Sequence, residues 1–186
     1  FLFLGLHVIN AQATQQECTI KYNLFKGDYQ SKKYDDAFPN WIYLMDNCPT
    51  LSINIYKLGD KLTEARFKKA TNKTEAVVLV KRVYKQRLEY FPTKDPAKVH
   101  SDYATFLVKN KLATDDEVFE ILELAYSIDP TRMGVKNIYR YFQGITDANK
   151  DTNPQKVFDT YDDVLESVGE KLDDYAKKLR DLNAKV

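Results

Sequence analysis

The chain has 186 residues, which corresponds to one domain or a short array of repeats. Its 28 basic and 27 acidic residues nearly balance, which excludes the strong basic excess typical of general nucleic-acid-binding proteins. Hydrophobic residues make up 44% of the chain, enough for a core, while 6 glycines and 6 prolines are too few for a many-turned β-sandwich or barrel.

The first 13 residues, FLFLGLHVINAQA, are typical of the later part of a secretory signal peptide. The stretch is largely apolar through Ile9, carries no Lys, Arg, Asp or Glu, and ends in the small-residue pattern Ala11-Gln12-Ala13. It is too short for a membrane span, which needs about 20 apolar residues. We expect cleavage after Ala13 and a periplasmic location, and a buried N-terminal strand is the alternative.

Most of the remaining chain shows the apolar spacing of amphipathic α-helices. Val118, Leu122 and Ala125 are typical, because they recur three or four positions apart. Helix-start signals separate these segments, such as Asn153 before Pro154. We therefore expect an all-α protein with helices at residues 15–30, 34–47, 51–70, 73–91, 96–111, 115–128, 132–148 and 154–185. The short connections between them predict antiparallel neighbours.

Prolines divide the predicted helices into pairs. Pro49, Pro92 and Pro130 each follow a predicted second helix, at intervals of 43 and 38 residues, and a proline just past a helix end prevents its continuation. This spacing indicates a degenerate tetratricopeptide array, an α-solenoid of helical hairpins, over residues 14–150, with an irregular helical bundle as the alternative. The residues expected at its packing positions are Leu24, Tyr34, Ala37, Trp41, Leu58, Gly59 and Ala125.

The two cysteines, Cys18 and Cys48, fall at the ends of the first predicted hairpin. An even number of cysteines in an exported chain favours a disulfide. In an antiparallel hairpin the start of the first helix lies beside the end of the second, so a disulfide here would close the open end of a terminal repeat. Two buried free thiols are the alternative.

Further short motifs accompany the cysteines. They are Tyr34-Asp35-Asp36-Ala37, Trp41, Asn47-Cys48-Pro49, Tyr56-Lys57-Leu58-Gly59 and Lys85-Gln86-Arg87-Leu88-Glu89-Tyr90-Phe91. In this combination, over about residues 18–145, the chain resembles uncharacterised exported tetratricopeptide-like proteins of the Bacteroidota. The resemblance implies a helical-repeat fold and export without an assigned activity. Members of that family are usually longer, which implies a further C-terminal part.

The predicted C-terminal helix, within residues 151–186, has a different apolar pattern. Its apolar residues step by three and four without interruption, and we call them the heptad face: Phe158, Tyr161, Leu165, Val168, Leu172, Tyr175, Leu179, Leu182 and Val186. A strict heptad repeat indicates another long helix alongside. That helix would be the preceding one, one beyond Val186, or a second copy joined through Phe158, Leu165, Leu172 and Leu179. A helix that only caps the last repeat is the alternative.

No motif for catalysis, a cofactor or a metal stands out in the sequence. GxSxG, HExxH, CxxC and a glycine-rich phosphate loop do not occur. His100 is the only histidine outside the leader and is expected on a partly exposed helix face. Asp147 to Asn153 copies the first half of a calcium loop, but Thr152 stands where the turn needs glycine and Phe158 where a bidentate glutamate is required.

Charge is distributed unevenly along the chain. Residues 66–87 are rich in lysine and arginine, and residues 115–123 are rich in aspartate and glutamate. Both segments are expected to be solvated helix faces, or else to attract an acidic partner or a polyanionic surface polysaccharide.

Three functions are compatible with this sequence. The favoured one is a scaffold without catalysis that binds a protein or peptide partner in the cell envelope, on a concave surface formed by the first helix of each pair. The aromatic residues expected on that surface are Tyr22, Phe25, Tyr29, Tyr56, Tyr103 and Phe106. The alternatives are a self-assembling structural protein joined through the heptad face and, less favoured, a hydrolase of envelope polymers with a carboxylate pair in a groove. We predict no nucleic-acid partner and no membrane span.

Overall fold

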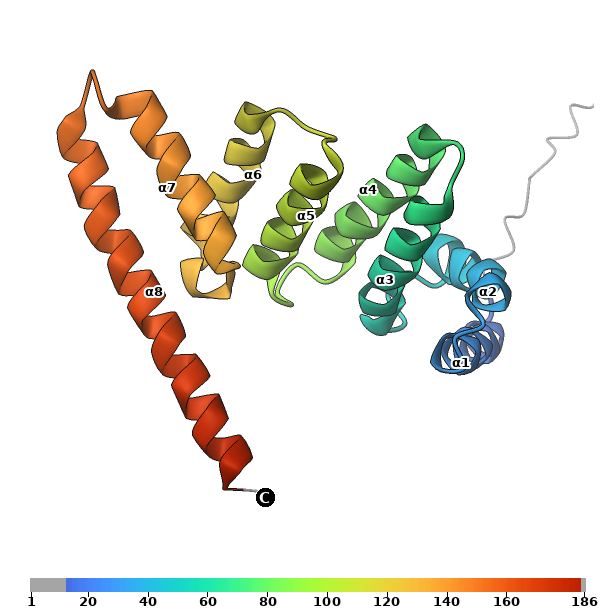
Figure 1. Ribbon diagram of the computed structural model, residues 1–186. Helices are drawn as coiled ribbons and strands as arrows, with labels where there is room; N and C mark the ends of the chain where they lie inside the picture. The colour runs from blue at the N-terminus through green and yellow to red at the C-terminus, as the bar shows by residue number, and fades with distance from the viewer. Residues whose placement is uncertain (1–12, 185–186) are drawn as a thin grey trace, which may run out of the picture. The chain divides into compact units, whose positions relative to one another are not determined.

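A computed structural model describes residues 13–184 of the chain (Figure 1). This part consists of eight α-helices and one short 3₁₀ helix, without a strand, which confirms the predicted all-α class. None of these helices combines the length and hydropathy that crossing a membrane requires. The chain divides into two compact units, unit 1 ending at Phe91 and unit 2 beginning at Pro92. The predicted leader lies outside the described residues, apart from Ala13.

Unit 1 contains two helical hairpins. The first pairs α1 (Gln15–Gln30) with α2 (Tyr34–Asn47), the second pairs α3 (Asn54–Lys69) with α4 (Lys73–Tyr90), and α2 packs on α3. These bounds match the predicted ones to within one residue, except that α3 begins three residues later. Residues 51–53 instead form a turn, in which the Leu51 amide donates to the Cys48 carbonyl and Ser52 Oγ accepts from the Asn54 amide.

The core of unit 1 is built around Trp41. The Trp41 side chain is fully buried, and its Nε1 donates to the Ile55 carbonyl at 2.8 Å. Gly59 on α3 lies directly against this ring, since a Cβ at Gly59 would be 2.4 Å from Trp41 Nε1. The predicted packing roles of Ala37, Trp41 and Gly59 are therefore supported by their burial.

The packing role predicted for Leu24 in unit 1 is wrong. Leu24 is half exposed, whereas the next residue, Phe25, is fully buried. The two side chains point about 100° apart on a helix, so only one of them can face α2. The larger Phe25 ring fills that position and tilts against Tyr29 at 6.2 Å between centroids. Tyr34 and Leu58 are half-buried at the edge of the same core.

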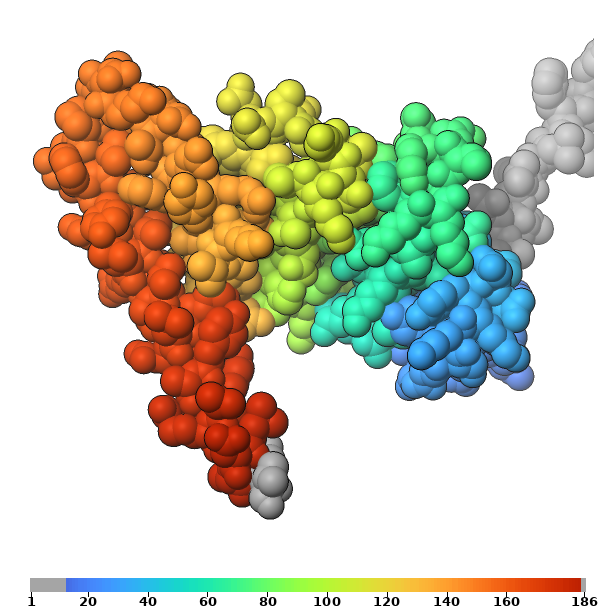
Figure 2. Space-filling model, in the orientation of Figure 1, coloured from blue at the N-terminus to red at the C-terminus, as the bar shows by residue number. Residues whose placement is uncertain are grey.

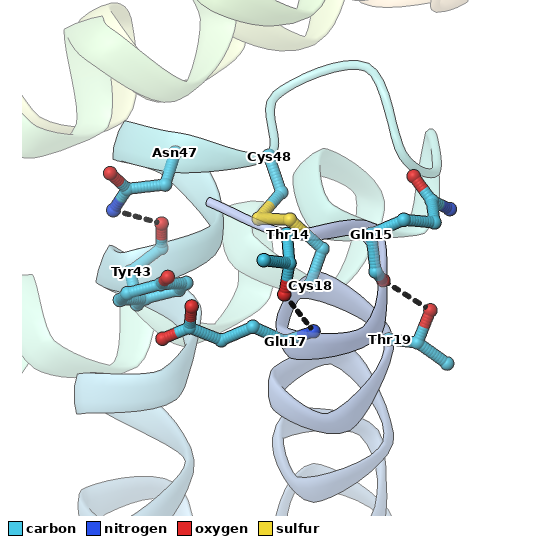
Figure 3. The surroundings of a disulfide bond; sticks show 8 residues. All are labelled: Thr14, Gln15, Glu17, Cys18, Thr19, Tyr43, Asn47 and Cys48. Carbon is cyan, nitrogen blue, oxygen red and sulfur yellow. Dashed lines mark hydrogen bonds between the residues drawn. A yellow bond between two sulfur atoms is a disulfide. The ribbon is translucent and has the colours of Figure 1, made fainter. Parts of the chain in front are cut away.

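A disulfide joins the two ends of the first hairpin, as predicted (Figure 3). Thr14 caps α1 by accepting a hydrogen bond from the Glu17 amide, which places Cys18 in the first turn of the helix. Cys48 follows the last residue of α2, and the Cα atoms of the two cysteines are 5.9 Å apart. Both cysteines are buried, so the bond belongs to the core of unit 1.

Unit 2 also contains two hairpins. α5 (Pro96–Asn110) pairs with α6 (Asp115–Ile128), and α7 (Val135–Asn149) pairs with α8 (Pro154–Asn183), while α6 packs on α7. The predicted helix at 132–148 begins later, at Val135, because η1 (Pro130–Arg132) precedes it. The Asp129 carboxylate fixes this short helix by accepting from the Thr131 amide at 2.9 Å.

The core of unit 2 combines apolar packing with one buried polar cluster. Leu122, Ala125 and Met133 are fully buried, which supports the predicted packing role of Ala125. Asn137 on α7 donates through Nδ2 to the carbonyl and the hydroxyl of Ser101 on α5, at 2.7 and 2.9 Å. These bonds satisfy side chains that would otherwise be costly to bury and fix α7 against α5.

Candidate interaction surface

The long helix α8 presents two different faces within unit 2. Thr160, Ser167 and Lys171 are buried against the rest of the unit, and Val164 and Val168 beside them are half-buried. Lys171 Nζ donates to the Thr131 carbonyl at 2.8 Å, and Ser167 Oγ lies 3.5 Å from the Tyr126 hydroxyl. α8 therefore packs on its own unit through two short polar side chains and one lysine, together with the two valines.

The heptad face of the same helix lies beside that contact and shares only Val168 and Tyr161 with it. Its large side chains are 47–65% exposed at Phe158, Tyr161, Leu165, Leu172, Tyr175, Leu179 and Leu182. Contiguous apolar surface of this extent on one element is typical of a binding surface rather than of ordinary solvent-exposed helix. The preceding helix, one of the three possible neighbours, contacts the heptad face only near its start, where the Phe142 ring of α7 lies 5.9 Å from the Tyr161 ring between centroids, and leaves most of the face exposed.

The C-terminal half of α8 has no support from unit 2. Every residue from Leu172 to Ala184 is exposed, and in Figures 1 and 2 this part of the helix extends past the end of α7. A helix of fewer than about 12–15 residues is marginal in water without packing on one face. Residues 172–184 continue a longer helix and so avoid the nucleation cost, but they gain no stabilisation from packing, which a partner on their apolar side would supply.

The aromatic surface predicted from the sequence does not form. Phe25, Tyr56 and Phe106 are buried, so they cannot line a binding surface, and this part of the prediction is wrong. Tyr56 donates to the Pro49 carbonyl at 2.9 Å, and burial raises the pKa of its hydroxyl well above the ordinary value. Phe25 and Tyr56 belong to the hydrophobic core of unit 1, where burial of their apolar area is stabilising.

The other three predicted aromatics are half-buried at hairpin edges. The Tyr22 hydroxyl accepts from Ser52 Oγ and Asn54 Nδ2, and the Tyr29 ring packs on Tyr34 at 5.5 Å between centroids. Burial also raises the pKa of Tyr103. These contacts lie within the units and give the rings a structural role.

The basic segment 66–87 lies in unit 1 beside a pocket of about 400 Å³ between α2, α3 and α4. Within that pocket the Arg66 guanidinium lies 3.8 Å above the Phe38 ring and bonds Asp35 at 3.2 Å. Arg82 pairs with Asp46, and Lys73 donates to the Phe67 and Lys68 carbonyls at the end of α3. Several of these cations are therefore used inside the unit, as helix caps and surface ion pairs.

The acidic segment 115–123 begins with a helix cap. Thr114 Oγ1 accepts from the Glu117 amide, and the Glu117 carboxylate accepts from the Thr114 amide at 2.7 Å. Acidic side chains in the first turn of α6 also interact favourably with the helix dipole. This accounts for the first acidic residues of the segment without a ligand.

Each of two pockets in the described residues is lined by two carboxylates, and one of each pair is bonded to a cation. In unit 1 the pocket holds Asp35 and Glu75, and Asp35 pairs with Arg66. In unit 2 a pocket of about 180 Å³ holds Asp115 and Asp147, and Asp147 pairs with Lys150. These pockets therefore give no support to the hydrolase alternative.

The loop that resembles half of a calcium site is used to connect α7 and α8. Asn149 donates to the Ile145 carbonyl at the end of α7, and Asn153 caps α8 by accepting from the Lys156 amide. Over residues 13–184 no group of three or more potential metal-ligating side chains comes together. The asparagines of this loop act as helix caps.

His100 is half-buried on α5, as expected, and offers a test by pH. Burial lowers its pKa below the ordinary value of 6.5, so the unfolded chain takes up a proton that the folded chain resists. Stability is therefore expected to fall as the pH drops through this range. In His100→Gln, unfolding monitored by circular dichroism should lose less stability between about pH 7.5 and pH 5 than the wild type does. An equal loss of stability in the variant and the wild type would contradict a lowered His100 pKa.

The fold places the chain in a broad class, an all-α protein of consecutive helical hairpins. Among the described residues, a prominent exposed apolar surface is the heptad face of α8. No model of a known protein family matches the chain, and no curated protein matches it.

Proposed function

We propose that this chain is an exported helical-repeat scaffold that mediates protein–protein interaction in the periplasm or the cell envelope, without catalysis. The observation that carries the proposal is the heptad face of α8, which leaves seven large apolar side chains about half exposed or more. A disulfide in the core of unit 1 is compatible with folding in an oxidising compartment. The tetratricopeptide-like resemblance supports a scaffold role of the same kind.

The heptad face favours a helical partner. Side chains at alternating steps of three and four residues form a strip that matches the corresponding strip of another helix, by knobs-into-holes packing. A partner helix would also stabilise residues 172–184, which lack support within unit 2. The scaffold would thus bind its partner through α8 and use the hairpins to hold that helix in place.

The test is capture from an envelope extract by the full chain. We expect the double variant Leu172→Lys/Leu179→Lys to lose about tenfold or more of the proteins captured by the wild type, since a charge at the centre of an apolar interface is strongly unfavourable. Leu24→Lys/Val78→Lys is the matched control, because both residues are exposed apolar side chains of unit 1. Undiminished capture by the α8 variant would overturn the proposal.

A further inference from the structure

We propose that the heptad face of α8 is covered by the same face of a second copy of this chain, in antiparallel orientation. This inference rests on the proposed function and names the partner of that surface.

The register of an antiparallel pair uses every apolar residue of the described heptad face. If Val168 of one copy faces Leu172 of the other, then Leu165 faces Tyr175, Tyr161 faces Leu179, and Phe158 faces Leu182. The two-fold axis then passes beside residue 170, close to the middle of α8 (Pro154–Asn183). Each apolar side chain thereby meets another, and none is left against solvent at either end.

Charge along α8 favours the antiparallel orientation over the parallel one. Residues 154–170 carry one lysine and five carboxylates, a formal charge of −4, while residues 171–184 carry four cations and three carboxylates, a formal charge of +1. A parallel pair would place the two acidic halves side by side. An antiparallel pair places each acidic half beside the weakly basic half of the other copy, which removes that repulsion.

The exposed area is sufficient for a dimer. Seven side chains that are 47–65% exposed, of types with about 150–250 Å² of surface, offer on the order of 700 Å² per copy. A standard stable interface buries about 800 Å² from each partner. Unit 2 contacts the heptad face only at Tyr161 and Val168, so a second helix would meet the remaining exposed side chains beside these contacts.

Gly169 gives the pair room to approach at its centre. It is exposed, and a Cβ built on it would meet no atom within 4 Å. Gly169 lies on the exposed side of the heptad face, next to the proposed two-fold axis, where the two copies of the residue come together. Glycine weakens an isolated helix, and at a crossing point it permits close contact between backbones.

The experiment measures mass and orientation on the full chain. Light scattering after gel filtration should give twice the chain mass at a protein concentration of about 100 μM. The weakest interfaces of this size have a Kd in the micromolar range, so most of the protein should be dimeric at that concentration. Leu172→Lys/Leu179→Lys should be monomeric, with the Trp41 fluorescence of folded unit 1 unchanged. Leu24→Lys/Val78→Lys should remain dimeric.

Orientation is tested by mixing two single-cysteine variants, Phe158→Cys and Leu182→Cys, under mild oxidation. The antiparallel pair predicts a crosslinked dimer in the mixture and little in either variant alone. Crosslinking of each variant with itself would indicate a parallel pair and would overturn the proposed orientation.

The remaining outcomes separate this inference from the proposed function. A wild-type monomer at about 100 μM overturns the dimer. If that monomer still captures envelope proteins through the heptad face, the proposed function stands with another partner. A dimer that persists in Leu172→Lys/Leu179→Lys overturns the assignment of the surface.

Discussion

Replacing both cysteines by alanine is expected to lower the free energy of unfolding of unit 1 by about 3–4 kcal/mol. The disulfide closes a loop between residues 30 positions apart, and in the chain-entropy model a loop of that length restricts the unfolded chain by about this amount. Both side chains are buried, so the change also removes contacts in the core. The measurement is denaturant unfolding followed by the fluorescence of Trp41, the only tryptophan, which is buried in unit 1.

Reductant supplies the control for this prediction. Wild-type protein in excess reductant should lose most of the same stability, while Cys18→Ala/Cys48→Ala should not respond to reductant. Amide exchange is expected to accelerate most in α1, because the disulfide ties its first turn to the end of α2. If the double variant were as stable as the oxidised wild type, the disulfide would have no stabilising role.

Substitution of Gly59 by alanine is expected to destabilise unit 1 by about 1–3 kcal/mol, although alanine is the better helix former. The added methyl group would lie 2.4 Å from Trp41 Nε1 and 2.7 Å from Trp41 Cε2, so the indole must shift. That shift also strains its hydrogen bond to the Ile55 carbonyl. Trp41→Ala, which removes the ring itself, should cost about 3–5 kcal/mol.

Gly27 is the matched control for this substitution. It lies inside α1, and a Cβ there would meet no atom within 4 Å. Gly27→Ala should therefore stabilise unit 1 by about 0.5–1 kcal/mol through helix propensity alone. Denaturant midpoints followed by circular dichroism compare the variants. Equal effects at the two positions would show that the contact with Trp41 carries no energy.

The disulfide is an example of a contact that local sequence patterns can predict. Helix ends and hairpin order were predictable, and an antiparallel hairpin brings Cys18 beside Cys48 whatever its neighbours do. Gly59 shows the limit of the same reasoning. Its place in a repeat pattern marked it as a packing residue, while the identity of the ring against it depends on how α2 crosses α3.

The aromatic residues show why the predicted surface failed. Periodicity identifies which residues share a helix face, but a first helix has one face toward its hairpin partner and another toward the open side. The sequence pattern allows either face for Phe25, Tyr56 and Phe106. Burying a large ring in the core is more favourable than leaving it on the open side. Which residues are buried is decided only once the neighbouring helices are in place.

The sequence by itself determined the helices of this protein, their pairing into hairpins, the disulfide and the heptad repeat of α8, because each depends on spacing along one or two neighbouring segments. Only the tertiary structure decided which face of α8 meets unit 2. Thr160 and Ser167 are small enough to be buried against unit 2, Ser167 Oγ lies 3.5 Å from the Tyr126 hydroxyl of α6, and Lys171 Nζ donates to a carbonyl of η1. That fit depends on the shape of three assembled elements, and it leaves the apolar side of α8 for another molecule.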